Sequence, residues 1–145
     1  MKVAHYEYNF LTRKSAHAVF NLLLEVNKWW VGFYEETITG SSQKIGDQFS
    51  FHAGGGMHIT KQKLVELIPN KKIVWLVTES NLSFLNNTDE WKDTKLIFDL
   101  QQNLEGETKV QFTHEGLVPQ IECYDQCTSA WSQYLKQLET NLNPK

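Results

Sequence analysis

Apolar and polar side chains alternate in several short segments of the chain, and a period of two residues is typical of β-strands. Segment 2–12 is the first of these, and segments 48–52, 94–102 and 109–115 repeat the pattern. The side chains expected on the inward face are Ala4, Tyr6, Tyr8, Phe10, Phe49, Phe51, Leu96, Phe98, Leu100, Val110, Phe112 and His114. The last two segments flank a Glu-Gly turn and form the clearest predicted hairpin.

A second hairpin is predicted from segments 57–68 and 72–79, because the Pro-Asn-Lys sequence between them favours a tight turn. Leu64 and Val65 are both apolar, so the first strand can change faces at a β-bulge. The inward residues expected in the second strand are Trp75 and Val77.

Three stretches are expected to be turns or loops. Residues 40–46 are rich in turn-forming residues, and residues 54–56 are three glycines. A phosphate-binding loop would continue through Lys-Ser/Thr into a helix, so the glycines are interpreted as a turn between strands. Residues 81–93 are polar and irregular, with apolar side chains at Leu82, Phe84, Leu85 and Trp91. Long loops of this kind often border the mouth of a cavity.

Two segments have helical periodicity. Ser15 is a suitable N-cap for a short helix whose apolar face is Ala16, Val19, Phe20, Leu23 and Leu24. Near the C-terminus an apolar stripe recurs at steps of three and four residues: Tyr124, Cys127, Trp131, Tyr134, Leu135, Leu138 and Leu142. Glu122 and Asp125 in its first turn favour the helix dipole. A stripe of this length requires a sheet to pack against.

Between the short helix and the next strand lies an aromatic cluster of Trp29, Trp30, Phe33 and Tyr34. Its side chains are too bulky to lie free in water, so the cluster is interpreted as a helical turn that folds over the core and can act as a lid. The order strand, helix, several strands, long helix predicts an α+β fold with helices on one face of an antiparallel sheet. One domain over residues 1–145 is expected from the length.

Composition narrows the classes of function. The net charge is -3, and the Lys and Arg residues are scattered among acids, which argues against a nucleic-acid surface. Polar residues interrupt every apolar run, so no signal peptide or membrane span is predicted and the cytoplasm is the expected location. Aromatic residues make up 12% of the chain, which fits either a packed interior or the walls of an apolar ligand site.

Candidate reactive residues are few. Cys123 and Cys127 are four residues apart in the predicted long helix, so they are expected to be reduced thiols. With His114 they would form an incomplete zinc set, and no metal is predicted. His114 can orient a ligand or can be a hydrogen-bonded core residue. Three unpaired acids are interpreted as exposed and not as general bases: Glu79, Asp89 and Glu90.

The order of elements resembles the helix-grip fold of the START/Bet v 1-like (SRPBCC) superfamily, in its branch related to the C-terminal domain of the activator of Hsp90 ATPase. The residues that carry the resemblance are Trp29-Trp30, segment 46–49, segment 65–69 leading to Val74-Trp75, segment 106–117, segment 122–127, Ala130-Trp131 and Tyr134-Leu135. The Gly-Trp usual in the last helix is Ala130-Trp131 here, a small-for-small change.

The resemblance implies a curved antiparallel sheet wrapped around the long C-terminal helix, with a hydrophobic cavity between them. Members of the superfamily include lipid carriers, cyclases, hydroxylase partners and co-chaperones, so the fold does not fix the function. The function expected first is binding of a small hydrophobic or amphipathic ligand, with no cofactor. The alternatives are an Hsp90 co-chaperone-like interaction protein and an enzyme acting on a hydrophobic substrate. The chain is expected to be a monomer or a homodimer.

The residues expected to contact the ligand project into the space between the sheet and the last helix. They are Tyr8, Trp30, Phe49, Phe51, Trp75, Phe98, Phe112, His114, Cys127, Trp131 and Tyr134. The same side chains could instead fill a solid core, and the sequence leaves that alternative open. His114, Tyr134 and Tyr8 are the candidate polar contacts.

Overall fold

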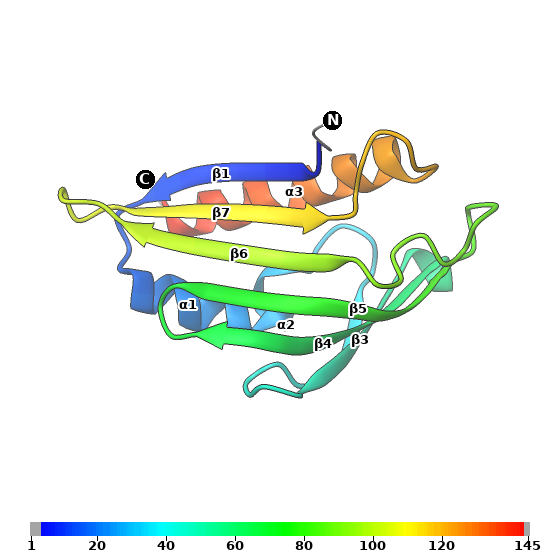
Figure 1. Cartoon of the computed structure of the whole chain (residues 1–145), viewed down its shortest axis with the longest axis horizontal. Coiled ribbons are helices and arrows are strands. Elements are labelled where there is room, and N and C mark those ends of the chain that lie inside the picture. Colours follow the sequence, from blue (N-terminus) through cyan, green and yellow to red (C-terminus); the bar gives the residue numbers. More distant parts are fainter. Residues whose placement is uncertain (1–3, 144–145) are drawn as a thin grey trace.

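The strands expected from the alternating pattern pair into one antiparallel sheet in the computed structural model, which describes residues 4–143 (Figure 1). The sheet has seven strands in the order β1-β7-β6-β5-β4-β3-β2. Their bounds are β1 Tyr6–Thr12, β2 Thr37–Gly40, β3 Gln48–Ala53, β4 His58–Ile68, β5 Lys72–Leu82, β6 Lys95–Gln102 and β7 Thr108–Glu115. The first strand thus pairs with the last, and every other neighbour pair is consecutive in the chain.

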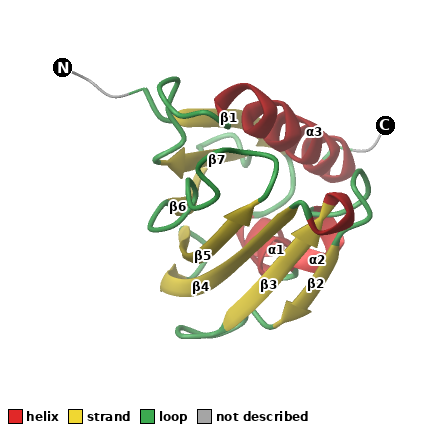
Figure 2. Cartoon of the chain, turned by 90° about the vertical axis from the view of Figure 1, so that its right-hand side faces the viewer, coloured by secondary structure: helices red, strands yellow, loops and turns green. Residues whose placement is uncertain are grey.

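The helices of the described residues all pack on one face of this sheet (Figure 1). They are α1 Ala16–Leu24, α2 Val26–Trp29 and α3 Tyr124–Leu142, and a 3-10 turn, η1 Gly54–Gly56, joins β3 to β4. Figure 2 shows the sheet curving around α3 and the pair α1 and α2. This is the helix-grip arrangement, and the predicted α+β class is confirmed.

The hairpin of β4 and β5 turns where the sequence predicted it. Asn70 adopts a positive φ of 63°, and the backbone N–H of Lys71 donates to the carbonyl of Ile68 at 2.9 Å. The register shifts between Leu64 and Glu66, as expected for a β-bulge. Leu64 is consequently buried, whereas Val65 is 38% exposed on the outer face.

Strand β2 was not predicted, because it is short and mostly exposed and therefore shows no clear alternation. Gly40 ends it with a φ of 122° and pairs with Phe49. A Cβ on Gly40 would lie 2.4 Å from the carbonyl oxygen of Gln48, so only glycine fits this position. The predicted turn therefore begins after Gly40.

Two predictions, on the start of the first strand and on the aromatic cluster, were wrong in part. Strand β1 begins at Tyr6, Ala4 is exposed, and Lys2 and Val3 lie outside the described residues. In the aromatic cluster, Trp29 and Trp30 are buried, but Phe33 and Tyr34 are 41% and 40% exposed. The helical turn ends at Trp29, and in the segment that follows the two rings pack edge-on against Tyr134 of α3 while remaining partly exposed.

The expectation of reduced cysteines is also corrected, because Cys123 and Cys127 form a disulfide. Cys123 is the N-cap residue of α3, and its carbonyl accepts the backbone N–H of Cys127 at 2.8 Å. Its Cα lies 5.5 Å from that of Cys127, inside the range that disulfides span. The bridge closes the first turn of α3.

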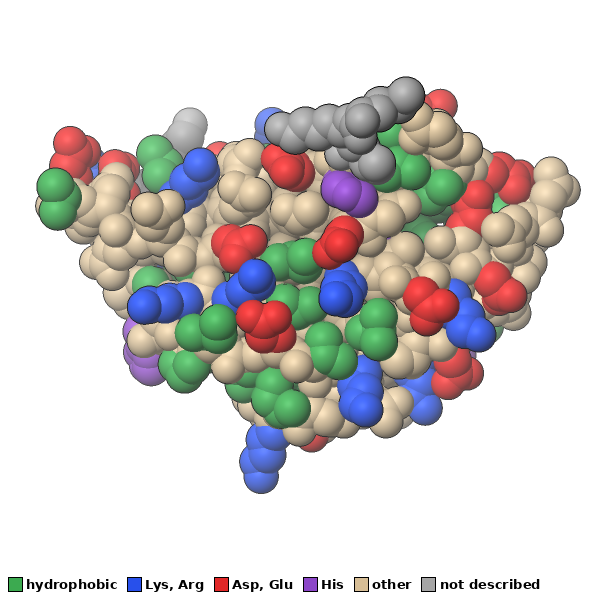
Figure 3. All heavy atoms as spheres, in the orientation of Figure 1, with side chains coloured by type: hydrophobic (Ala, Val, Ile, Leu, Met, Phe, Trp, Pro, Cys, Tyr) green, Lys and Arg blue, Asp and Glu red, His purple; other side chains and the backbone are tan. Residues whose placement is uncertain are grey.

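The outer face of the sheet carries mixed charges and no basic stripe (Figure 3). Lys61 pairs with Glu79 at 3.6 Å and Lys72 with Asp99 at 4.0 Å. Within residues 4–143, no helix combines the length and the apolar character that a membrane crossing requires.

Candidate ligand-binding cavity

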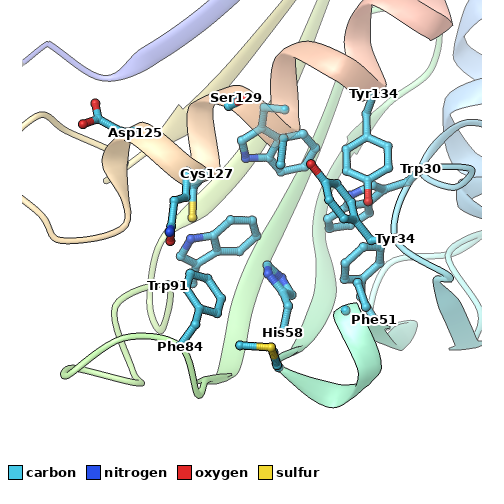
Figure 4. Close-up of a pocket in the computed structure, with 16 residues that line it drawn as sticks. Trp30, Tyr34, Phe51, His58, Phe84, Trp91, Asp125, Cys127, Ser129 and Tyr134 are labelled. Atoms are coloured by element: carbon cyan, nitrogen blue, oxygen red, sulfur yellow. The ribbon is translucent and has the colours of Figure 1, made fainter.

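A cavity of about 570 Å³ lies between the first half of α3 and the end of the sheet formed by β3 and the start of β4 (Figure 4). Its walls are mostly aromatic and aliphatic. Trp131 and Tyr134 reach it from α3, Phe51 from β3, and Trp91 from the loop after β5. Its position follows from the curvature of the sheet, which separates β3 from β7 across the width of α3 (Figure 2).

The cavity wall is built from rings packed face to face. Trp30 stacks on Phe51 with a centroid separation of 4.2 Å and on Trp131 at 4.9 Å. Trp91 lies parallel to Trp131 at 5.8 Å. Neighbouring rings of this kind restrict each other's rotation, so the apolar wall is held in a fixed arrangement.

The segment between α2 and β2 closes one side of the cavity and is fastened to α3 through Glu36. The Glu36 carboxylate accepts hydrogen bonds from the backbone N–H groups of Gly32, Phe33 and Tyr34 at 2.8, 3.1 and 3.0 Å. It also accepts the hydroxyl proton of Tyr134 at 2.5 Å. A second link joins the Tyr34 hydroxyl to a side chain of α3, at Gln133 Oε1.

These hydrogen bonds determine the protonation states of Glu36 and Tyr134. Burial alone would raise the pKa of Glu36, but the hydrogen bonds from Tyr134 and from the backbone of Gly32 and Phe33 outweigh it and lower that pKa. Burial and the neighbouring carboxylate raise the pKa of Tyr134. The result is a charged acceptor and a neutral donor at neutral pH, which is the strong form of this contact.

On the opposite side of the cavity, the carboxylates of Glu90 and Glu122 link the loop after β5 to the start of α3. Glu90 accepts the backbone N–H groups of Glu122 and Cys123, both at 2.8 Å, at the start of α3. Glu122 in turn accepts the backbone N–H of Asn86 at 3.0 Å. Glu90 was expected to be exposed, but it is half-buried because it satisfies N–H groups that a helix start leaves unpaired. Asp89 and Glu79 are exposed, as expected.

His114 lies behind the cavity wall and is fully hydrogen-bonded. The indole N–H of Trp131 donates to Nδ1 at 3.0 Å, which leaves the proton on Nε2 to be donated to Thr94 Oγ1 at 2.9 Å. The Thr94 hydroxyl then donates to the carbonyl of Trp91 at 2.6 Å. Burial lowers the pKa of His114 to about 3, so the ring is neutral. Of the two interpretations left open, the structure matches the core histidine.

The structure separates the predicted ligand contacts into two groups. Trp30, Phe51, Cys127, Trp131 and Tyr134 line the cavity. Those placed in the adjoining core, away from the cavity surface, are Phe49, Trp75, Phe98, Phe112 and His114. The remaining candidate is Tyr8, which donates its hydroxyl proton to Glu139 at 2.7 Å, toward the far end of α3.

Other lining residues were not among the predicted contacts. Phe84 and Trp91 come from the loop that was expected to border a cavity mouth, so the sequence carried a signal for them. Met57 and His58 follow the three glycines, and Tyr34 belongs to the segment over α3. Nothing in the sequence marks these three as neighbours, because long-range packing alone brings their loops together.

His58 differs from His114 in its surroundings, although burial lowers its pKa too, to about 4. Its Nε2 atom is enclosed by the wall and has no hydrogen-bond partner among the described residues. The indole Nε1 of Trp91 is also buried and has no hydrogen-bond partner among these residues. Across residues 4–143, no group of three His, Cys, Asp or Glu side chains is placed to hold a metal ion. The cavity is therefore suited to apolar contacts with a few hydrogen bonds.

The sequence matches the family described as Activator of Hsp90 ATPase homolog 1-like protein over residues 11–143. The chain belongs to this family. No curated protein matches the chain closely enough in sequence to count as a relative. The predicted branch of the START/Bet v 1-like superfamily is thus confirmed.

Solved structures of low sequence identity share the fold of this AHSA1-like chain. The Aha1 dimer from Colwellia psychrerythraea has a TM-score of 0.74 at 23% identity and covers 97% of each chain. A protein from Chromobacterium violaceum has a TM-score of 0.68 at 18% identity, again over 97% of each chain. An HSP90 activator from Plasmodium falciparum has a TM-score of 0.63 at 19% identity, over 94% of each chain.

Proposed function

We propose that this AHSA1-like chain binds a small, mainly apolar molecule in the cavity beneath the first half of α3. The observation that carries the proposal is the cavity itself, about 570 Å³ in volume with walls of stacked aromatic rings. Small-molecule sites usually measure about 300–1,000 Å³ and combine apolar walls with a few placed polar groups. Membership of the family fits such a role.

The way the cavity is framed supports the same function. Hydrogen-bonded carboxylates fix the walls to α3 on two sides, Glu36 at Tyr134 and Glu90 at the start of the helix. Walls held in place by such contacts offer a bound molecule a preformed surface, which lowers the entropic cost of binding. The adjoining core around Phe98 and Phe112 is closely packed, so the space is confined to one end of α3.

A second candidate function is co-chaperone-like interaction with Hsp90. It is favoured by the family match and by the neighbour of the same fold that is an HSP90 activator. Both functions are compatible with a protein of the cytoplasm. They differ in what they require of the cavity, because a surface interaction leaves it unused.

Binding of Nile red, a neutral apolar dye, tests the cavity. The native protein should bind about one equivalent saturably, with a fluorescence increase that reports a dry site. Ala130→Trp should weaken binding at least tenfold, since Ala130 lines the cavity and an indole there fills it. Ala18→Trp is the matched control, because Ala18 is exposed on α1, and it should bind the dye as the wild type does.

Circular dichroism establishes that both variants are folded before affinities are compared. Equal dye affinity in Ala130→Trp and the wild type would contradict the proposed site. If the dye does not bind at all, while the chain raises the ATPase rate of Hsp90, the second function replaces the first.

A further inference from the structure

Two nitrogen atoms in the cavity wall are buried without a hydrogen-bond partner among residues 4–143: Nε1 of Trp91 and Nε2 of His58. Both residues line the cavity, and their rings touch edge to face with centroids 4.7 Å apart (Figure 4). Native proteins pair nearly all buried polar groups, so an unpaired group calls for an explanation. Here two of them are adjacent in the same wall.

Comparison with equivalent groups elsewhere in the chain shows that these two are exceptional. The indole N–H groups of Trp29, Trp75 and Trp131 donate to Leu23 O at 2.9 Å, Ser42 Oγ at 2.7 Å and His114 Nδ1 at 3.0 Å. Both ring nitrogens of His114 are also paired. The fold thus supplies partners for three buried indoles, including that of Trp131 in the cavity wall, and for both nitrogens of His114, but not for Trp91 Nε1 or His58 Nε2.

The charges around the cavity restrict what can pair with these nitrogens. His58 is neutral at pH 7, because burial lowers its pKa to about 4. Asp125 is the one lining residue among those described that carries a formal charge, and it is exposed. A buried carboxylate or phosphate would meet no positive charge here and would lose its hydration, so an anionic ligand is disfavoured.

The hydrogen-bonding capacity of the two nitrogens restricts the ligand further. The indole Nε1 of Trp91 can only donate, so its partner must be an acceptor. A neutral imidazole nitrogen can donate or accept according to its tautomer. A hydroxyl or carbonyl oxygen can therefore pair with either nitrogen. Both are enclosed by the wall, so the oxygen reaches them after a small rotation of a ring, a change that commonly accompanies binding.

We propose, on the basis of the binding function above, that the ligand is a neutral, largely aromatic molecule with a hydroxyl or carbonyl oxygen, and that Trp91 Nε1 or His58 Nε2 binds this oxygen. The stacked rings of Trp30, Phe51 and Trp131 contact the flat apolar part. His58 or Trp91 then selects polar aromatic ligands over purely apolar ones.

Displacement of Nile red by three naphthalenes of similar size tests this assignment. The probes are 2-naphthol, 2-methylnaphthalene and 2-naphthoate, which offer a hydroxyl group, no polar atom and an anion. The measured quantity is the ratio of the dissociation constants of 2-methylnaphthalene and 2-naphthol. This ratio should fall about tenfold in at least one of His58→Phe and Trp91→Phe, equivalent to about 1.4 kcal/mol. A ratio compared between variants cancels the different solubilities of the probes in water.

Met57→Leu is the control, because Met57 lines the same cavity and has no hydrogen-bonding nitrogen. It should change both affinities by the same factor. His58→Phe should not destabilise the fold, because the substitution removes an unpaired polar atom and keeps a ring. Its melting temperature should therefore be no lower than that of the wild type.

The outcomes separate this inference from the proposed function. An unchanged ratio in both variants, with all probes still displacing the dye, overturns the assigned contacts and leaves ligand binding intact. Tightest binding of 2-naphthoate overturns the neutral ligand. If neither the dye nor any naphthalene binds, the proposed function itself is wrong.

Discussion

At the scale of single residues, the buried His114 and the half-buried His58 differ in their hydrogen bonds. His114 is fixed as one tautomer by Trp131 and Thr94, and it connects α3 to the loop that carries Trp91. His58 touches the same Trp91 ring but leaves Nε2 unpaired. The fold therefore holds one fully paired histidine and one with an unpaired nitrogen in the cavity wall.

Trp131 is the residue on which most of these contacts converge. It is 1% exposed, stacks with Trp30, and donates to His114. Trp131→Ala should lower the free energy of unfolding by roughly 3–5 kcal/mol, because it removes the ring and leaves Nδ1 of His114 without a donor. Urea denaturation measures this loss. Phe33→Ala, at a ring that is 41% exposed, should cost below about 1 kcal/mol. Equal losses in the two variants would show that the cavity face of α3 has been misassigned.

At the scale of elements, α3 is attached to the rest of the fold along its whole length. Glu90 holds its start, Glu36 its middle through Tyr134, and Thr12 its end, where the threonine hydroxyl donates to Leu142 O at 3.0 Å. The cavity lies beneath the first half of the helix, between the first two attachments. Hydrogen bonds therefore fix the position of α3 on both sides of the cavity.

Glu36 is the attachment that a single conservative substitution can test. Glu36→Gln keeps the shape but replaces a charged acceptor, and it should lower the free energy of unfolding by about 1–2 kcal/mol at pH 7. The lowered pKa of Glu36 means that its contribution is present above the ordinary value of 4.5 and is lost as the pH falls below it. Wild type and variant should therefore converge in acid. Glu35→Gln, in the same segment but exposed, is the control. A constant difference at every pH would assign the effect to packing.

At the scale of the whole molecule, the sequence predicted which face of each strand is buried better than it predicted the cavity. Phe49 and Phe51 both point inward from β3, as the alternation indicated, yet only Phe51 lines the cavity. Alternation reports the face of a strand and carries no information on the position of a residue along α3. The walls supplied by Tyr34 and His58 depend on contacts between distant segments, which local patterns do not encode.

The stability of the folded molecule should depend on pH through His114 and His58. Burial lowers the pKa of His58 to about 4 and that of His114 to about 3, from an ordinary value of 6.5, and the proximity of His58 further disfavours protonation of His114. Below pH 6.5 the unfolded chain binds protons that the folded chain does not, so stability is complete above that pH and is lost as the pH falls toward 4.

Each histidine contributes up to about 1.4 kcal/mol per pH unit in this window, so the loss between pH 6.5 and pH 4.5 should reach a few kcal/mol. Urea denaturation at pH 7, 5.5 and 4.5 measures the slope. His58→Phe should reduce it, because one of the two groups that take up a proton on unfolding is gone, while the Trp131–His114–Thr94 contacts remain. A free energy of unfolding that stays constant from pH 7 to 4.5 would mean that both imidazoles can be protonated within the folded protein, and the neutral cavity wall inferred for His58 would then be wrong.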